Sequence, residues 1–244
     1  MTVLDEISIT IGFPLLTFLC FDQRSRLFLA SASHATRSIW YGTLSASPHI
    51  VAIFSAPLLS FLSDHWGRKK LLMIGAFGAL IYAIVATTSI LFGSLTLLLV
   101  GSLVYGVSAR TQPIALAVVG DLSDAKDKKI NMGYLQVAIS VGAFLGPMIG
   151  GYFATRFLFP TFNFSLPYII AAIAGMLTVL LTQCYFKETY KPAIKEKFAL
   201  IAPLKSLMNP PVLNISIILI LTQISWRFYY QFVPPILKLH SNYS

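Results

Sequence analysis

The stretch Ser-Asp-His-Trp-Gly-Arg-Lys-Lys at residues 63–70 separates two long apolar runs, and most of its side chains are polar or charged. A charged hairpin this short is hard to place in the core of a soluble protein, because charged side chains are rarely buried there. It is typical of a turn between two membrane-spanning helices, and its Arg and Lys residues favour the cytoplasmic side. We therefore predict such a turn here.

The composition supports the same class of protein. Of the 244 residues, 56% are hydrophobic and 11% are charged, which leaves too few ionisable groups to cover a soluble globule of this size. A bilayer core about 30 Å thick is crossed by roughly 20 mostly apolar residues in a helix, and only helices or closed barrels satisfy their backbone there. The apolar runs are too long for barrel strands, so we predict an all-α integral membrane protein that sits in the lipid bilayer.

Seven apolar runs are long enough to be membrane-spanning helices. They cover residues 3–21, 39–62, 71–92, 95–119, 132–154, 167–186 and 212–237. The connections are short except for one basic, proline-containing segment, which separates six runs from the seventh. The predicted domains are a six-helix N-terminal bundle at 1–186, a basic cytoplasmic linker at 187–211, a seventh transmembrane helix at 212–237 and a short tail at 238–244.

The net charge of +9 could indicate a nucleic-acid partner, but the positions of the basic residues favour a membrane topology. The turns after the second, fourth and sixth runs hold 11 of the 18 Lys and Arg residues, namely Arg68, Lys69, Lys70, Lys126, Lys128, Lys129, Lys187, Lys191, Lys195, Lys197 and Lys205. The alternate turns hold four, namely Arg24, Arg26, Arg37 and Arg156. Because cytoplasmic loops collect Lys and Arg, we predict that the even-numbered loops lie in the cytoplasm, although Arg24 and Arg26 weaken the asymmetry. No nucleic-acid partner is expected.

The polar turn also resembles the loop that joins the second and third transmembrane helices in the major facilitator superfamily. The usual form of that loop is Gly-x-x-x-Asp-Arg-x-Gly-Arg-Lys/Arg. Four positions of this chain match it, namely Asp64, Gly67, Arg68 and Lys69. Ser60 and His65 depart from it. Without the resemblance, the stretch would be a solvated turn with cytoplasmic charges.

The resemblance implies a role for the turn. In the family, the arginine pairs with an acidic residue at the end of the fourth helix and locks the outward-facing state. Asp121, in Val-Val-Gly-Asp-Leu-Ser, stands where that acid is expected. Gly67 permits a tight turn, and Arg68 offers a planar fork that suits a carboxylate. We expect Asp64, Arg68 and Asp121 to form a conformational latch.

A second resemblance lies in the fifth apolar run, where Gly-Ala-Phe-Leu-Gly-Pro-Met-Ile-Gly-Gly occupies residues 142–151. It fits the Gly-x-x-x-Gly-Pro-x-x-Gly-Gly pattern of facilitator-superfamily antiporters at every fixed position, namely Gly142, Gly146, Pro147, Gly150 and Gly151. Glycines four residues apart give a helix face that a neighbouring backbone can approach closely, and the proline favours a kink. The alternative is a generic packing face of small residues. The resemblance implies a helix that seals or times the pathway without touching the substrate.

Two acidic residues near the amino terminus are candidate proton sites. Leu4 and Asp5, with Pro14 nine residues after the acid, parallel the first helix of tetracycline-type exporters. On that register Asp5 lies inside the membrane helix, and the first turns of the helix would precede the start of this chain. A buried Asp5 or Glu6 could then bind the coupling proton. The alternative is an ordinary acidic amino terminus in water.

The fourth apolar run departs from the family, which usually has an arginine four residues before the glycine equivalent to Gly106. This chain has Ser102 there. Arg110 lies eight residues further on, on roughly the same helix face. An intramembrane arginine is costly and is functional by default, so Arg110 is a candidate site residue. The alternative is a side chain that snorkels or pairs near a helix end.

Two further side chains remain open between a structural and a functional role. His49 follows Pro48 inside the second run, where it is either a hydrogen-bonded core or lumen histidine or a proton relay. Arg227 lies among aromatic residues in the seventh run, where it either meets an anionic or aromatic substrate or snorkels beside an interfacial aromatic belt. Glu188 and Thr189 resemble the Glu-Thr ending of the family's sixth helix, which supports the alignment but assigns no chemistry.

The chain shows no metal-ligand spacing, phosphate-binding glycine loop or nucleophile motif, so an enzyme is not expected and no cofactor beyond a proton gradient is implied. The resemblance is to the drug and proton antiporter branch, near tetracycline-type exporters. It implies efflux of a small amphipathic molecule from a bacterial cytoplasmic membrane. Because the second half of that fold is missing here, the alternative is a truncated remnant or a half-transporter that needs a partner chain. A facilitator without proton coupling is a third interpretation, suggested by Ser102.

Overall fold

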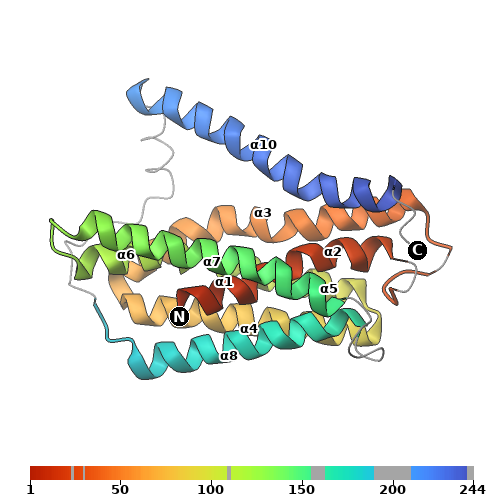
Figure 1. Ribbon diagram of the computed structural model, residues 1–244, viewed down its shortest axis with the longest axis horizontal. Helices are drawn as coiled ribbons and strands as arrows, with labels where there is room; N and C mark the ends of the chain where they lie inside the picture. Colours follow the sequence, from red (N-terminus) through yellow and green to blue (C-terminus); the bar gives the residue numbers. More distant parts are fainter. Residues whose placement is uncertain (23–24, 30, 109–110, 155–162, 190–209, 241–244) are drawn as a thin grey trace. The chain divides into compact units, whose positions relative to one another are not determined.

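The computed structural model describes residues 1–22, 25–29, 31–108, 111–154, 163–189 and 210–240. These residues are helical apart from turns and connections, and they contain no strand (Figure 1). The helices are α1 (Thr2–Thr10), α2 (Gly12–Phe21), α3 (His34–Trp66), α4 (Arg68–Phe92), α5 (Leu95–Ser108), α6 (Thr111–Leu122), α7 (Lys128–Ala154), the short η1 (Asn163–Ser165), α8 (Leu166–Tyr185) and α10 (Pro210–His240).

The chain divides into two units, Met1–Ala193 and Ile194–Ser244. The first unit is a bundle of α1 to α8, and the second contains the single long helix α10. The predicted boundaries of the linker and of the seventh transmembrane helix stay predictions.

Five helices in the described residues are long and apolar enough to cross a membrane, namely Thr2–Phe21 (α1 with α2), α3, α4, α7 and α8. They coincide with the first, second, third, fifth and sixth predicted runs. The fourth predicted run is carried by α5 and α6, which flank residues 109–110, outside the described part. Within α10, the segment Val212–Trp226 is apolar but shorter.

Local sequence explains where several helices begin and end. The break between α1 and α2 falls at Ile11, because Pro14 has no N–H to donate to the carbonyl of Thr10. The Ser33 side chain accepts a hydrogen bond from the backbone N–H of Thr36 at 3.1 Å and caps the start of α3. Gly93, with a φ of 68°, ends α4 in the left-handed conformation that glycine adopts at little cost.

Two of the apolar clusters in the bundle lie at its opposite ends. One lies around Leu27 and includes the fully buried Leu15, Leu19 and Tyr168. The other lies beneath the 63–70 turn and consists of Leu59, Leu71, Leu72, Ile114 and Val118. The second cluster joins α3, α4 and α6, so it fixes the ends of the three helices that carry the polar turn.

Close helix contacts rely on small residues. Figure 1 shows α4 beside α8 and α1 beside α7, and both pairs are in extensive contact. Between α3 and α5, a Cβ atom added to Gly106 would lie 2.6 Å from the carbonyl oxygen of Pro48, which is too close. The Ser55 hydroxyl donates to the Gly106 carbonyl at 2.8 Å across the same contact. Such approaches are typical of helices that pack within a membrane.

Candidate functional site

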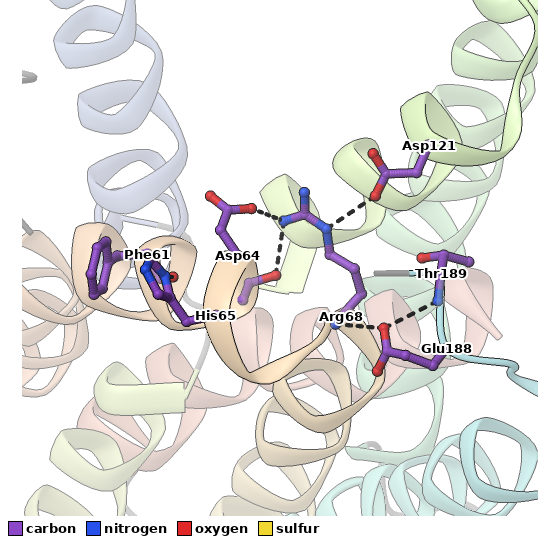
Figure 2. A network of polar contacts seen from close by, with 8 residues as sticks. Phe61, Asp64, His65, Arg68, Asp121, Glu188 and Thr189 are labelled. Carbon is purple, nitrogen blue, oxygen red and sulfur yellow. Dashed lines mark hydrogen bonds and ion pairs between the residues drawn. The ribbon is translucent and has the colours of Figure 1, made fainter. Parts of the chain in front are cut away.

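The polar turn gathers Ser63, Asp64, Arg68 and Asp121, which we name the Arg68 cluster (Figure 2). The Arg68 Nη1 atom lies 2.6 Å from Asp64 Oδ1, and it donates to the Ser63 hydroxyl at 3.0 Å. The Nε atom donates to Asp121 Oδ2 at 3.2 Å. The structure therefore brings together the three charged residues of the predicted latch, one each from α3, α4 and α6.

The three side chains differ in their contact with water. The Arg68 side chain is 15% exposed, Asp121 is 33% exposed and Asp64 is 50% exposed. Exposed ion pairs contribute only about 0–1 kcal/mol, because water and salt screen them. A cluster of this kind can form and break at modest cost, and the pair with Asp121 is screened less than the pair with Asp64.

Gly67 makes the tight turn possible. Its φ of 103° lies in a region that residues with a Cβ atom rarely adopt, and it separates the end of α3 from the start of α4. Lys69 donates from Nζ to the carbonyl oxygen of Gln183, in the last turn of α8, at 2.8 Å. His65, which departs from the family pattern, places its ring 4.1 Å from the ring of Phe61, and Figure 2 shows it pointing away from Arg68.

Glu188, to which the sequence analysis assigned no chemistry, is a member of this site. Its carboxylate accepts hydrogen bonds from the backbone N–H groups of Arg68 at 2.9 Å and of Lys69 at 3.1 Å. These N–H groups have no partner within their own helix, and the positive end of the helix dipole favours a carboxylate there. One feature of the sequence points to such a contact. Gly67 precedes α4 and has no side chain that could cap the start of this helix, so the cap must come from another residue.

A buried polar site lies further inside the bundle, around Asp5. The Asp5 side chain is buried, and its Oδ2 atom accepts a hydrogen bond from the Thr111 hydroxyl at 2.8 Å. Asp5, Glu6, Thr111, Gln112, Thr178 and Thr182 contribute to the lining of a small cavity between α1, α4, α6 and α8. Its volume of about 20 Å³ leaves room for roughly one water molecule. No Lys or Arg among the described residues lines it.

The glycine pattern of α7 faces α1 and α2. A Cβ atom at Gly142 would lie 2.8 Å from the Val3 carbonyl oxygen, and one at Gly146 would collide with Thr10. At Gly150 it would collide with the carbonyl oxygen of Ile11. Gly151, in contrast, has open space where its Cβ would be. Pro147 lies inside the continuous helix α7.

The other candidates are separate from both sites or outside the description. His49 is half-buried in α3, with Nδ1 3.1 Å from the Ser45 carbonyl oxygen of its own helix. Arg110 lies outside the described residues. Arg227 lies in α10, in the second unit, and the position of its side chain is not described.

Apolar helices of this length, packed as a bundle, define the class as all-α integral membrane proteins that cross the bilayer several times. Within this class, the chain belongs to the Major Facilitator Superfamily, whose family model matches residues 7–244. The predictions of an all-α membrane fold and of membership in this superfamily are both confirmed.

Several curated relatives are bacterial tetracycline resistance proteins. The chain is 31% identical to the class H protein of Pasteurella multocida over 192 residues, which cover 78% of this chain and 44% of the relative. It is 30% identical to the class B protein of Escherichia coli over 190 residues, which cover 78% of this chain and 43% of the relative. The chain therefore spans about half the length of the curated relatives that it matches.

A solved structure supports the fold. The human organic anion transporter MFSD10 (TETRAN) matches 84% of this chain and 52% of its own chain, with a TM-score of 0.67 and 22% sequence identity. The chain is thus a multi-pass membrane protein of a transporter family, and nothing in its described residues indicates catalysis.

Proposed function

We propose that this chain supplies one half of a proton-coupled exporter of small amphipathic molecules. Its relatives carry the name of resistance to one such molecule, tetracycline. The proposed location is a bacterial cytoplasmic membrane, with the Lys- and Arg-rich turns on the cytoplasmic side. The proposed domains are those that the apolar runs predict, a six-helix bundle at 1–186, a linker at 187–211, a seventh helix at 212–237 and a tail at 238–244.

The proposal of proton coupling rests on the carboxylate of Asp5, which is buried in a helix long enough to span the membrane. Ionisable groups inside a membrane are expensive and usually belong to ion or proton pathways. Asp5 has a hydroxyl partner from α6 and a second carboxylate, Glu6, beside it in sequence. The proposed role of Asp5, with Glu6 as its neighbour, is to take up and release the transported proton.

The proposed role of the Arg68 cluster is that of a latch between conformations. Alternating access in this type of transporter arises when one half rocks against the other around a central site. The cluster ties together the ends of α3, α4 and α6 through two ion pairs that are weak enough to break. The glycine face of α7 keeps its proposed role in sealing the bundle, because it packs directly against the helix that carries Asp5 and Glu6.

A transport pathway between two bundles needs two walls, and the first unit described here provides one. We therefore propose that activity requires a second bundle, and that this chain acts as a half-transporter where a partner chain supplies that bundle. The transported molecule would contact both bundles.

The test is substrate movement by the purified full chain, co-reconstituted with a second bundle from a relative, in lipid vesicles under an imposed pH gradient, with tetracycline and a fluorescent cationic dye as probes. Accumulation that stops when an ionophore collapses the gradient, and that Asp5→Asn abolishes while Lys70→Gln leaves it intact, would support the proposal. Absence of transport by the chain, alone and when co-reconstituted with a second bundle from a relative, would overturn it.

A second candidate is a facilitator without proton coupling, and the position of Ser102 favours it. This residue stands where the family pattern has an arginine, it is 4% exposed, and its hydroxyl donates to the Leu98 carbonyl of its own helix at 2.9 Å. A position that usually holds a buried cation is therefore neutral here. Transport that continues at the same rate after the gradient collapses would select this candidate.

A further inference from the structure

Gly67 and Glu188 lie so close that a side chain at residue 67 would displace the Glu188 carboxylate. A Cβ atom added to Gly67 would lie 2.5 Å from Oε2 and 2.9 Å from the Cδ atom of Glu188. The glycine therefore serves the turn in two ways. It adopts the positive φ of 103°, and it leaves the space in which a carboxylate from a distant part of the chain reaches the start of α4.

Arg68 makes polar contacts through both its backbone and its side chain. Its backbone N–H donates to Glu188, and its guanidinium contacts Asp64 and Asp121. Because the backbone and the guanidinium belong to one residue, the carboxylate that fixes the first turn of α4 also fixes the point from which the Arg68 side chain extends. Figure 2 shows the carboxylate and the guanidinium on opposite sides of this residue.

The same contact joins two helix ends with complementary dipoles. Glu188 meets the positive start of α4, and Lys69 donates from Nζ to the Gln183 carbonyl at the negative end of α8. Glu188 lies three residues after the end of α8 and belongs to the last residues of the first unit. In the sequence it precedes the segment that leads to the second unit.

We propose that Glu188 is a positioning residue for the Arg68 cluster, and that it couples the chain leaving α8 to the contacts that Arg68 makes. A movement of the end of α8 would pull on Glu188, release the first turn of α4 and shift the guanidinium between its two carboxylates. This inference rests on the proposed latch, and it adds the contact through which the end of α8 acts on it.

Amide hydrogen exchange of the full chain in lipid nanodiscs tests the capping contact independently of transport. The first amides of a helix exchange quickly unless they are capped. Glu188→Ala should accelerate exchange at Arg68 and Lys69 about tenfold or more, because hydrogen bonds to charged groups are among the stronger ones. Glu188→Gln, which keeps one oxygen acceptor, should accelerate exchange to an intermediate extent. If the alanine variant does not fold, the glutamine variant alone tests the capping contact.

The matched control is Lys187→Gln, which changes one charge at the adjacent, exposed position. It should leave the exchange of both amides unchanged. Exchange that is the same in wild type and in the two Glu188 variants would overturn the proposal.

The pairing of residue 67 with Glu188 gives a second measurement. Gly67→Ala should lower the melting temperature strongly in the wild-type chain, because the new methyl group meets both an unfavourable φ and the carboxylate. In the Glu188→Ala background only the unfavourable φ remains, so the same substitution should lower the melting temperature less. Strictly additive losses would contradict the pairing.

Transport rates separate this inference from the proposed latch. Glu188→Ala should slow transport, and it should add little to Arg68→Ala in the double variant, because both act on the same cluster. If Arg68→Ala leaves transport unchanged, the latch itself is wrong. If Arg68→Ala slows transport and Glu188→Ala does not, the latch stands and the positioning role of Glu188 is wrong.

Discussion

The hydroxyl of Thr111 donates a hydrogen bond to the carboxylate of Asp5, with 2.8 Å between Oγ1 and Oδ2 and 106 residues of sequence between the partners. Both side chains are buried. The bond joins the first helix of the bundle to α6 in the buried interior, where an acceptor that loses its donor cannot turn to bulk water. This pair is therefore expected to hold α1 against α6 as well as to orient the carboxylate.

Thr111→Val keeps the shape of the side chain and removes the donor. We expect it to lower the free energy of unfolding by about 1–3 kcal/mol, the usual cost of leaving a buried acceptor without its partner. Chemical unfolding in detergent, followed by circular dichroism, measures the loss. The control is Thr178→Val, since the Thr178 hydroxyl lines the same cavity but donates to the Ala174 carbonyl of its own helix at 2.9 Å. Equal losses in the two variants would argue against a special role for the Thr111 bond.

Substitution of Arg68 tests the latch. Arg68→Ala should slow transport about two- to thirtyfold, because it breaks two pairs and up to about 1 kcal/mol of differential stability is lost with each. Arg68→Lys should be slow as well, since an ammonium lacks the fork that reaches two carboxylates. Initial rates in vesicles, divided by the amount of folded protein, are the measurement, and Lys70→Gln is the control on the same turn. Unchanged rates in a well-folded Arg68→Ala protein would exclude the latch.

Substitutions of the two acidic partners of Arg68 should slow transport to different extents. Asp121 is 33% exposed and Asp64 is 50% exposed, so the pair with Asp121 is screened less by salt. Asp121→Asn is therefore expected to slow transport more than Asp64→Asn. Raising the salt concentration should reduce the difference between the Asp64 variant and wild type first. The reverse order of the two variants would show that exposure does not set their importance.

The fold and part of the site could be predicted from the sequence. Long apolar runs predict helices because the bilayer leaves the backbone no other partner than itself, and the Arg68 cluster follows from a motif whose residues are close in the chain except for Asp121. The role of Glu188 could not be predicted in this way, although its resemblance to the family's Glu-Thr ending singled it out. A lone carboxylate after a helix has no spacing that identifies its partner, and its oxygens accept from backbone N–H groups, which nearly every residue carries.

Helix periodicity explains why not every glycine of the motif in α7 takes part in packing. Gly142, Gly146 and Gly150 are four residues apart and share one face, whereas Gly151 is turned by about 100° from Gly150. Its Cβ position is open, so it takes no part in the contact with α1 and α2. A motif match names residues that occur together, but the helical period decides which of them face the same neighbour.

This arrangement predicts opposite effects on stability for alanine substitutions at the adjacent Gly150 and Gly151. Gly150→Ala should lower stability by about 1–3 kcal/mol, because its methyl group would collide with the Ile11 carbonyl oxygen at the junction of α1 and α2. Gly151→Ala should be neutral or slightly stabilising, since alanine favours a helix over glycine and meets nothing there. Thermal unfolding of both variants in the same detergent compares them directly. A loss in Gly151→Ala as large as in Gly150→Ala would show that α7 has a second tightly packed face.

Substitutions at the contact between α3 and α5 can distinguish the effect of close packing from the effect of a hydrogen bond. A methyl group at Gly106 would lie 2.6 Å from the Pro48 carbonyl oxygen and 2.8 Å from its Cα atom, so two backbones would have to separate. Gly106→Ala is therefore expected to cost about 1–3 kcal/mol of stability. Ser55→Ala removes only the 2.8 Å hydrogen bond to the Gly106 carbonyl, and bonds of this kind between membrane helices average about 0.6 kcal/mol. Gly42→Ala, on α3 in open space, is the control. If Ser55→Ala proves more harmful than Gly106→Ala, the hydrogen bond and not the close backbone approach holds α3 to α5, and the glycine there is replaceable.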